Sequence, residues 1–159
     1  MIFIVVGFQF IDFRRNCLED KNYSENLLYG KVKEGINIIR ICKFKNCKAF
    51  KQKVAIPFIG KEILNMKKEK ESILCPICGG YVKPLTVGFN HCKYLIKGTI
   101  IEENSLKNFE ISGSSPYYAQ YFSPDRCGLV NFLDLTIRVD IILGPLCENN
   151  PNIYKYFSY

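Results

Sequence analysis

The sequence predicts a β-rich α+β fold in which a zinc-ribbon-like antiparallel sheet core carries additional strands. Two observations predict this class. Short runs of β-branched and aromatic residues alternate with glycine and proline, which is typical of strands joined by turns. Two pairs of closely spaced cysteines lie between such runs, as they do where a metal ion holds two turns of a small sheet together.

The chain is long enough for one compact domain with its own core. It has 159 residues, of which 48% are apolar, and its formal net charge is +7. A chain of this size and composition can fold without disulfide staples, and its charge favours acidic partners without identifying one. We divide it into an N-terminal strand and connector (residues 1–34), a zinc-ribbon-like domain (35–103) and a C-terminal β extension of the same fold (104–159).

The apolar N-terminal residues 1–13 allow two interpretations, a targeting segment or a buried strand. No basic residue precedes the run, Gln9 and Asp12 interrupt it, and Arg14 and Arg15 follow it, which is the reverse of a signal peptide. The run is also too short to span a bilayer. We therefore predict a buried strand and an intracellular protein, cytoplasmic or nuclear, with no membrane partner. Its cysteines are then expected to be reduced or metal-bound.

The middle of the chain contains the strand signals that flank the cysteines. Residues 36–41 are mostly isoleucine and predict a strand, buried on both faces, that runs directly into the first cysteine of a pair. A second strand is expected to end near Pro57. Residues 61–72 contain good helix formers, which favours an exposed helix over a charged loop. The polar residues 14–34 predict a connector or a short helix.

The C-terminal half contains further strand signals of unequal strength. Residues 81–87 and 92–101 predict two consecutive strands, with a break between them near Gly88. Residues 112–116 (SGSSP) predict a loop. Residues 132–143 show the clearest alternation in the chain and predict a half-buried strand. The side chains expected on its inward face are Leu133, Leu135, Ile137, Val139 and Ile141.

Four cysteines form two pairs whose spacing predicts one structural zinc ion. Cys42 and Cys47 enclose four residues, while Cys75 and Cys78 enclose proline and isoleucine and are followed by two glycines. A tetrahedral site needs four sulfurs that converge on one point, each about 2.3 Å from the zinc. Two turns that each point two sulfurs inward provide them. Residues 48–74 are long enough for two antiparallel strands joined by a turn, as in a zinc ribbon.

Two other interpretations of these cysteines remain open. Buried free thiols behave as small apolar side chains, but paired spacings beside lysines are unusual for core cysteines. The CPIC segment also matches dithiol oxidoreductases, which place the first cysteine at a helix N-terminus, where the helix dipole lowers its pKa. Here Gly79 and Gly80 follow, and then an extended pattern. A CPxC thiol oxidoreductase is therefore the less favoured alternative.

The other cysteines and the single histidine are assigned to structural positions. His91 and Cys92 are adjacent, so in an extended chain their side chains point to opposite faces and are poorly placed to act together. We predict that Cys92 packs in the core, and we keep either residue as an alternative ligand in place of Cys42 or Cys47. The cysteines without a partner spacing, predicted to be structural or surface thiols, are Cys17, Cys127 and Cys147.

The segment from Tyr29 to Gly98 resembles a group of zinc-ribbon proteins from amoebae, ciliates and related protists. The matching pieces are GINI, CKFKNCKAF, KQKVAIP, CPICGG and GFNHCKYLIKG. By this resemblance the four paired cysteines occupy the ligand positions, and Cys92 matches the cysteine after the Gly-Phe motif. Tyr94 stands where the group has tryptophan and His91 where it has asparagine, and IPFIGKEI departs from a Gly-Phe-Gly pattern, but no ligand is lost. Such sequences often accompany ubiquitin-like domains, which implies ubiquitin-linked adaptor work.

These patterns favour a structural zinc-binding module that binds a protein partner, since zinc ribbons fix a small sheet whose exposed face then makes contacts. The alternative is a nucleic-acid-binding zinc ribbon, because lysines interleave with Phe44 and Phe50. We expect these rings to pack inside and the lysines to be solvated. With one histidine, no phosphate loop and no nucleophile elbow, the sequence indicates no enzyme. The lysines concerned are Lys43, Lys45, Lys48, Lys51 and Lys53.

Overall fold

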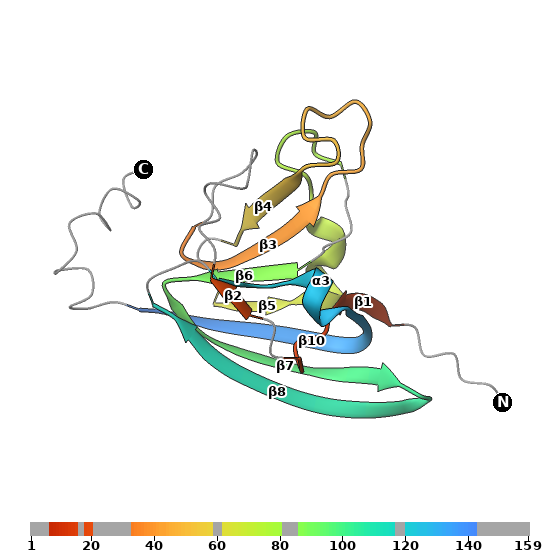
Figure 1. The fold of residues 1–159 in the computed structure, drawn as a ribbon, viewed down its shortest axis with the longest axis vertical. Helices are drawn as coiled ribbons and strands as arrows, with labels where there is room; N and C mark the ends of the chain where they lie inside the picture. The colour runs from red at the N-terminus through yellow and green to blue at the C-terminus, as the bar shows by residue number, and fades with distance from the viewer. Residues whose placement is uncertain are drawn as a thin grey trace.

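The fold is known from a computed structural model that describes residues 7–15, 18–20, 33–58, 62–80, 86–116 and 120–142. In this part of the chain ten strands form two five-stranded sheets, and every strand pair is antiparallel (Figure 1). The predicted β-rich, antiparallel class is thereby confirmed. The described helices are all short, and none is long and apolar enough to cross a membrane. They are α2 (Met66–Glu69), a 3₁₀ turn (Lys70–Ser72) and α3 (Pro124–Cys127).

The first sheet contains the long strands that curve across one side of the molecule in Figure 1. Its order is β1-β10-β7-β8, and β5 also pairs with β10. The β7–β8 hairpin turns through Glu103 and Asn104, whose φ angles of 52° and 60° match the twist of the strands in a two-residue turn. The strands are β1 (Phe8–Ile11), β5 (Ile63–Asn65), β7 (Cys92–Glu102), β8 (Ser105–Ser115) and β10 (Leu129–Ile141).

The second sheet has the order β2-β9-β6-β3-β4 and carries the first cysteine pair beyond the end of β3. Ile36, Ile38 and Ile39 in β3 are buried, as predicted for a strand covered on both faces. Strand β4 ends at Pro57, also as predicted, and proline is tolerated there because β4 lies at the edge. The strands are β2 (Leu18–Asp20), β3 (Gly35–Ile41), β4 (Lys53–Pro57), β6 (Thr86–Asn90) and β9 (Gln120–Phe122).

One hydrophobic core lies between the two sheets. Ile38 and Phe89 from the second sheet belong to the same buried cluster as Ile96 and Ile137 from the first. The ring of Tyr94 stacks on Phe89 at a centroid distance of 4.1 Å, which joins β7 to β6. Each fully buried aliphatic or aromatic side chain stabilises the fold by about 1.5–3 kcal/mol relative to exposure. The sandwich is therefore held together by its own apolar burial.

Two predicted elements differ from the structure near residues 61–72 and 14–34. Leu64 is fully buried in β5 and pairs with Ile137 of β10, so a short strand replaces the first half of the predicted helix. The second half of the predicted helix is helical, as α2 and the 3₁₀ turn that follows it, and the Asn65 side chain caps α2 by accepting from the backbone N–H of Lys68. Within residues 14–34, the structure places strand β2, and residues 21–32 lie outside the described part.

Three corrections concern the C-terminal half. Residues 112–115, predicted as a loop, are the end of β8 and pair with β7. Strand β6 continues through Gly88 to Asn90, and the break before β7 falls at His91, whose φ is 50°. A β-bulge at Leu133 shifts the register of β10, so Phe132 is buried and Leu133 is only half-buried. Ile141, at the end of the strand, is exposed. The other three predicted inward residues, Leu135, Ile137 and Val139, are buried.

Parts of three predicted strands lie outside the described residues. These parts are residues 1–6, 81–85 and 143. Strand β1 confirms that the N-terminal apolar run enters the sheet, where Phe10 and Ile11 are buried. The proposed division at residues 34 and 103 is not tested by this arrangement.

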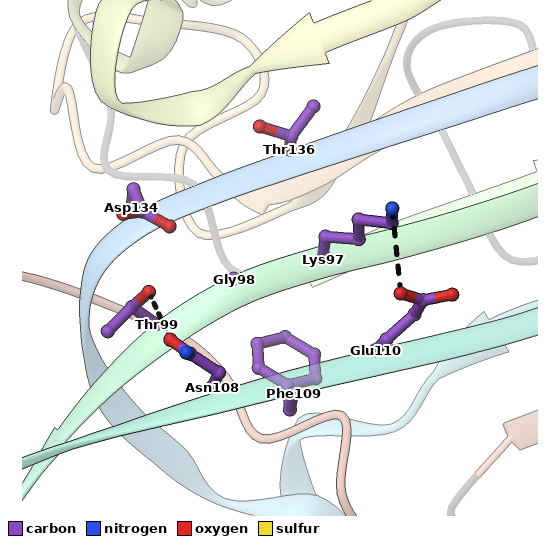
Figure 2. Close-up of a pocket in the computed structure, with 8 residues that line it drawn as sticks. All are labelled: Lys97, Gly98, Thr99, Asn108, Phe109, Glu110, Asp134 and Thr136. Atoms are coloured by element: carbon purple, nitrogen blue, oxygen red, sulfur yellow. Dashed lines mark hydrogen bonds and ion pairs between the residues drawn. The ribbon is translucent and has the colours of Figure 1, made fainter.

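An open hollow of about 450 Å³ lies on the first sheet, over β7, β8 and β10 (Figure 2). Its polar side chains pair with one another across the strands. Thr99 Oγ1 donates to Asn108 Oδ1 at 2.9 Å, and Lys97 Nζ lies 3.5 Å from Glu110 Oε2. These four side chains are thus engaged in cross-strand pairs that stabilise the hairpin, and we assign the hollow no ligand.

Candidate metal centre

Cys42 and Cys47 lie in a loop that follows β3 directly, and we call residues 42–47 the first knuckle. The backbone of Cys42 continues the strand pairing, because its N–H donates to Gln52 O at 3.2 Å and its carbonyl accepts from Lys51 N at 2.7 Å. Within the loop, Cys47 N donates to Phe44 O at 3.0 Å. These bonds close a tight turn that returns the chain to β4 with both cysteines buried.

Cys75 and Cys78 lie in a second turn, and we call residues 75–78 the second knuckle. Gly79 N donates to Cys75 O at 2.8 Å, and Cys75 N donates to Gly80 O at 2.9 Å, so the turn closes on itself. Gly79 has a φ of 70°, a left-handed conformation that a residue without a Cβ adopts at little cost. Cys75 is therefore not at the start of a helix, which removes the geometry on which the dithiol oxidoreductase interpretation depends.

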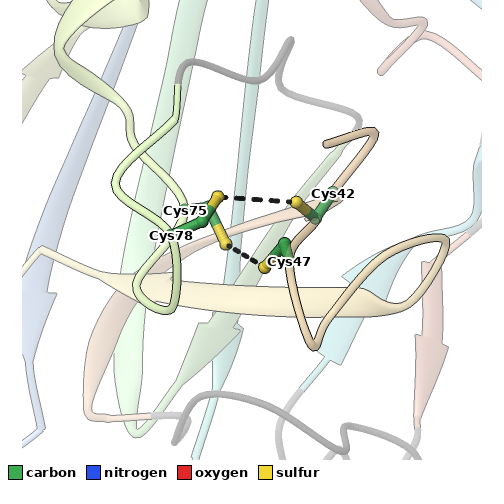
Figure 3. A group of neighbouring side chains, drawn as sticks. All are labelled: Cys42, Cys47, Cys75 and Cys78. Atoms are coloured by element: carbon green, nitrogen blue, oxygen red, sulfur yellow. Dashed lines mark hydrogen bonds between the residues drawn. The ribbon is translucent and has the colours of Figure 1, made fainter. Parts of the chain in front are cut away.

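The four predicted ligands converge on one point (Figure 3). Their sulfur atoms all lie within 4.8 Å of one another. The Cys42 and Cys78 sulfurs are 3.8 Å apart, and the Cys47 and Cys75 sulfurs are 3.9 Å apart. A regular tetrahedron with zinc–sulfur bonds of about 2.3 Å has sulfur–sulfur edges of about 3.8 Å. Two sulfur–sulfur distances therefore match the edges of a tetrahedral zinc site, the four sulfurs lie close enough together to hold a metal ion, and four thiol donors suit zinc chemically.

Backbone amides point at each sulfur in a repeated pattern. The N–H of Ala49 donates to the Cys47 sulfur at 3.3 Å, and that of Gly80 donates to the Cys78 sulfur at 3.4 Å. The N–H of Phe44 donates to the Cys42 sulfur, and the N–H groups of Ile77 and Cys78 donate to the Cys75 sulfur. Each sulfur thus accepts from the amide two residues later in the chain. Such bonds stabilise thiolates and orient metal ligands.

The thiols differ in how readily they lose a proton. Burial raises the pKa of Cys47 to about 12 and also raises the pKa of Cys42. Burial acts in the same direction on Cys75, but the backbone N–H groups of Cys78 and Ile77 outweigh it and lower its pKa to about 7. Zinc binds thiolates, so metal binding would release protons from the buried thiols.

Arg40 is a neighbour of the site that the sequence analysis did not assign. Its guanidinium is fully buried, and Nη1 donates to Ile73 O at 2.8 Å while Nη2 lies 3.4 Å from Gly80 O. These carbonyls stand at the two ends of the second knuckle, so Arg40 ties β3 to that loop. Its positive charge also lies beside a cluster that four thiolates and one zinc ion would make formally dianionic. The available signal was an arginine within a strand that is mostly isoleucine, GINIIRI.

The knuckles have a small core of their own, apart from the sandwich. This second cluster of buried residues contains two aliphatic side chains, Ala49 and Val54, together with three of the cysteines, Cys42, Cys47 and Cys75. The fourth cysteine, Cys78, is exposed. With so little apolar burial, the loops depend on interactions through the sulfurs and through Arg40.

Neither alternative ligand joins the cluster. Cys92 is buried in the main core, as predicted, and burial raises its pKa to about 12. His91 Nδ1 lies 2.8 Å from Asn90 Oδ1, and burial lowers the pKa of its imidazole. The four sulfurs are the one group of metal-ligating side chains found in the described residues.

Cys127 corrects the prediction that the cysteines are reduced or metal-bound. Cys127 is disulfide-bonded, whereas Cys42, Cys47, Cys75, Cys78 and Cys92 are free. Spacing along the chain does not reveal such a bond, since a disulfide needs two residues that the fold brings together. The other two cysteines called structural or surface thiols, Cys17 and Cys147, lie outside the described residues.

Phe44 corrects a second prediction, because it points outward. Its exposed fraction is 54%, whereas it was expected to pack inside. Phe50 is half-buried, and the ammonium group of Lys51 lies 5.3 Å from its ring centroid. The lysines of this stretch are exposed, as predicted.

Comparison with protein-family models, with curated proteins and with solved structures finds no match to this chain.

Proposed function

We propose that this protein is a structural zinc-binding module whose metal-held loops contact a protein partner. The observation that supports zinc binding is the convergence of the Cys42, Cys47, Cys75 and Cys78 sulfurs at the spacing of a tetrahedral site. A zinc ion bound by four thiolates has no open coordination position, so its role would be to hold the two knuckles in place. The resemblance to the protist group makes ubiquitin-linked adaptor work the specific form of this proposal.

Metal analysis of the native protein tests zinc binding. Purified full-length protein, dialysed against metal-free buffer, is expected to contain one zinc ion per chain by native mass spectrometry. Replacing Cys75 or Cys78 by serine should remove that ion, because each variant leaves three sulfurs at the site. Folded wild-type protein that holds no metal after zinc has been supplied would refute the proposal.

The ubiquitin-linked form is tested separately by titration of the zinc-loaded protein with monoubiquitin. Chemical-shift changes confined to the knuckles and their neighbours would support it. Unchanged spectra at millimolar ubiquitin would remove this form and leave the structural zinc site intact.

A nucleic-acid-binding module is the second candidate, and the exposed lysines between residues 43 and 53 favour it. Phosphate contacts would use these charges. However, the lysines beside the first knuckle also face the negative charge of a four-thiolate zinc cluster, which reduces what is left for phosphates. We therefore rank this candidate second.

A further inference from the structure

We propose that the two knuckles form a docking surface for a protein segment that carries an apolar side chain flanked by aspartate or glutamate. This inference rests on the proposed function of a protein-interaction module and specifies the chemistry of its partner. The surface, which we call the knuckle surface, consists of Phe44, Leu74 and Ile77 with the neighbouring lysines Lys43, Lys45, Lys48, Lys51 and Lys53.

Exposed apolar side chains gather on the two loops. Three of the seven large apolar side chains that are exposed in the described part of the chain belong to them, at 54% for Phe44, 45% for Leu74 and 44% for Ile77. Phe44 belongs to the first knuckle, Ile77 belongs to the second, and Leu74 directly precedes Cys75. Because the sulfurs of both loops lie within 4.8 Å of one another, these side chains are carried by one end of the molecule. Exposed apolar residues clustered in this way mark contact sites.

The charge around the first knuckle is positive, and no carboxylate of the described residues pairs with it, although a bound zinc cluster would offset part of it. The sequence contains no aspartate or glutamate between Glu34 and Glu62, a stretch that includes the first knuckle and β4. The five lysines are exposed, and among the described residues none of them forms an ion pair. An apolar patch beside unpaired positive charge is complementary to an apolar anchor beside carboxylates, which would also steer the encounter.

The composition of the patch favours a protein segment over nucleic acid. Leu74 and Ile77 are aliphatic and offer no flat ring for base stacking, so Phe44 is the one exposed aromatic residue of the patch. All three side chains are about half-exposed, so part of each is packed against the protein. Half-buried side chains on metal-held loops are already ordered, which lowers the entropic cost of binding a complementary segment.

Peptide selection on the zinc-loaded, full-length protein tests this proposal. The probe is a displayed library of random 12-residue peptides, and the best binder is then synthesised, labelled and titrated by fluorescence anisotropy. We expect enrichment of an apolar residue with aspartate or glutamate on either side. Phe44→Ser and Ile77→Ser should each weaken binding at least about tenfold, since truncating a central anchor has effects of this size. Leu106→Ser is the matched control, because Leu106 is 56% exposed in β8, and it should change binding less than about twofold.

Each alternative outcome has a defined meaning. Selection of peptides without carboxylates, or equal losses in Phe44→Ser and Leu106→Ser, would overturn the proposal. Tight binding to single-stranded RNA, or to vesicles containing phosphatidylserine, without peptide binding would overturn it in favour of those ligands. The zinc content of every sample is measured alongside. Protein that contains one zinc ion per chain and binds no peptide refutes only the docking surface, whereas protein that cannot hold zinc refutes the proposed function.

Discussion

Replacing Arg40 by methionine removes the buried guanidinium while keeping a long apolar side chain. In the native protein this group donates to Ile73 O at 2.8 Å and approaches Gly80 O at 3.4 Å. Gly80 in turn donates its N–H to the sulfur of Cys78. The substitution therefore acts on the position of the second knuckle, although Arg40 is not a metal ligand.

The size of the effect follows from these contacts. A hydrogen bond from a charged donor contributes about 1.5–3 kcal/mol, and an acceptor left unsatisfied in a buried position costs about 1–3 kcal/mol. The bond to Ile73 is short and buried, so we assign it the full energy of a charged hydrogen bond. The contact with Gly80 is long, so we assign it only part of that energy. The expected loss is about 3 kcal/mol. Since metal binding and ordering of the loop are coupled, about 100-fold weaker zinc binding should result.

Competition with a chromophoric chelator measures this affinity, and cobalt substitution reports the geometry through its thiolate charge-transfer bands. Arg40→Lys keeps the charge but cannot reach both carbonyls, so its affinity should fall between that of the wild type and that of Arg40→Met. Arg138→Met is the matched control, because Arg138 is exposed in β10. The reasoning is refuted if Arg40→Met is folded and binds zinc within about threefold of the wild-type affinity.

Three further predictions concern the cysteines, the metal and the lysines. Cys92→Ser and Cys127→Ser should keep one zinc ion per chain by native mass spectrometry, and so should Cys17→Ser and Cys147→Ser; loss of zinc in any of them would show that the ligand set is wrong. A strong chelator should speed amide hydrogen exchange in both knuckles while β7 and β10 stay protected, and uniform exchange would contradict separate cores. Short single-stranded RNA and DNA should bind more weakly than low-micromolar near physiological salt. Tighter binding that is lost on replacing Lys43, Lys45, Lys51 and Lys53 by serine would favour the nucleic-acid candidate.

The elements that the sequence predicts best are those with a local cause. Four of the seven residues of β3 are isoleucine, which is β-branched and apolar, so the strand and its burial follow largely from composition. The turn that holds each cysteine pair follows from the short spacing within the pair and, in the second pair, from Gly79, which permits a left-handed turn. These signals lie within a few residues of the structure they specify.

The elements that the sequence does not predict depend on distant pairing. Strand β8 has mostly exposed side chains and ends in SGSS, yet it pairs with β7 over its whole length, and this partner overrides the turn signals. Strand β5 is similar, because Leu64 pairs with Ile137 more than seventy positions away. This last pairing also departs from the expected zinc-ribbon layout. The strand before the second cysteine pair joins the first sheet, whereas β4 stays beside β3 in the second. The zinc-ribbon part of the fold prediction thus stays a prediction.

The separation of the two cores predicts that a bound metal would matter for the loops in particular. The apolar contribution of Ala49 and Val54 is a few kcal/mol at most, at about 1.5–3 kcal/mol for a fully buried aliphatic side chain. Ordering the backbone of the two loops costs about 1–2 kcal/mol for each residue fixed, which the small cluster cannot offset alone. The sandwich has a much larger apolar core, which includes Ile38, Phe89 and Ile137, and its apolar burial offsets the cost of ordering its backbone. Beside the backbone hydrogen bonds of the loops, Arg40 and the proposed zinc ion would then supply much of the order of the knuckles, so we expect the knuckle surface to take its binding form only when the metal is bound.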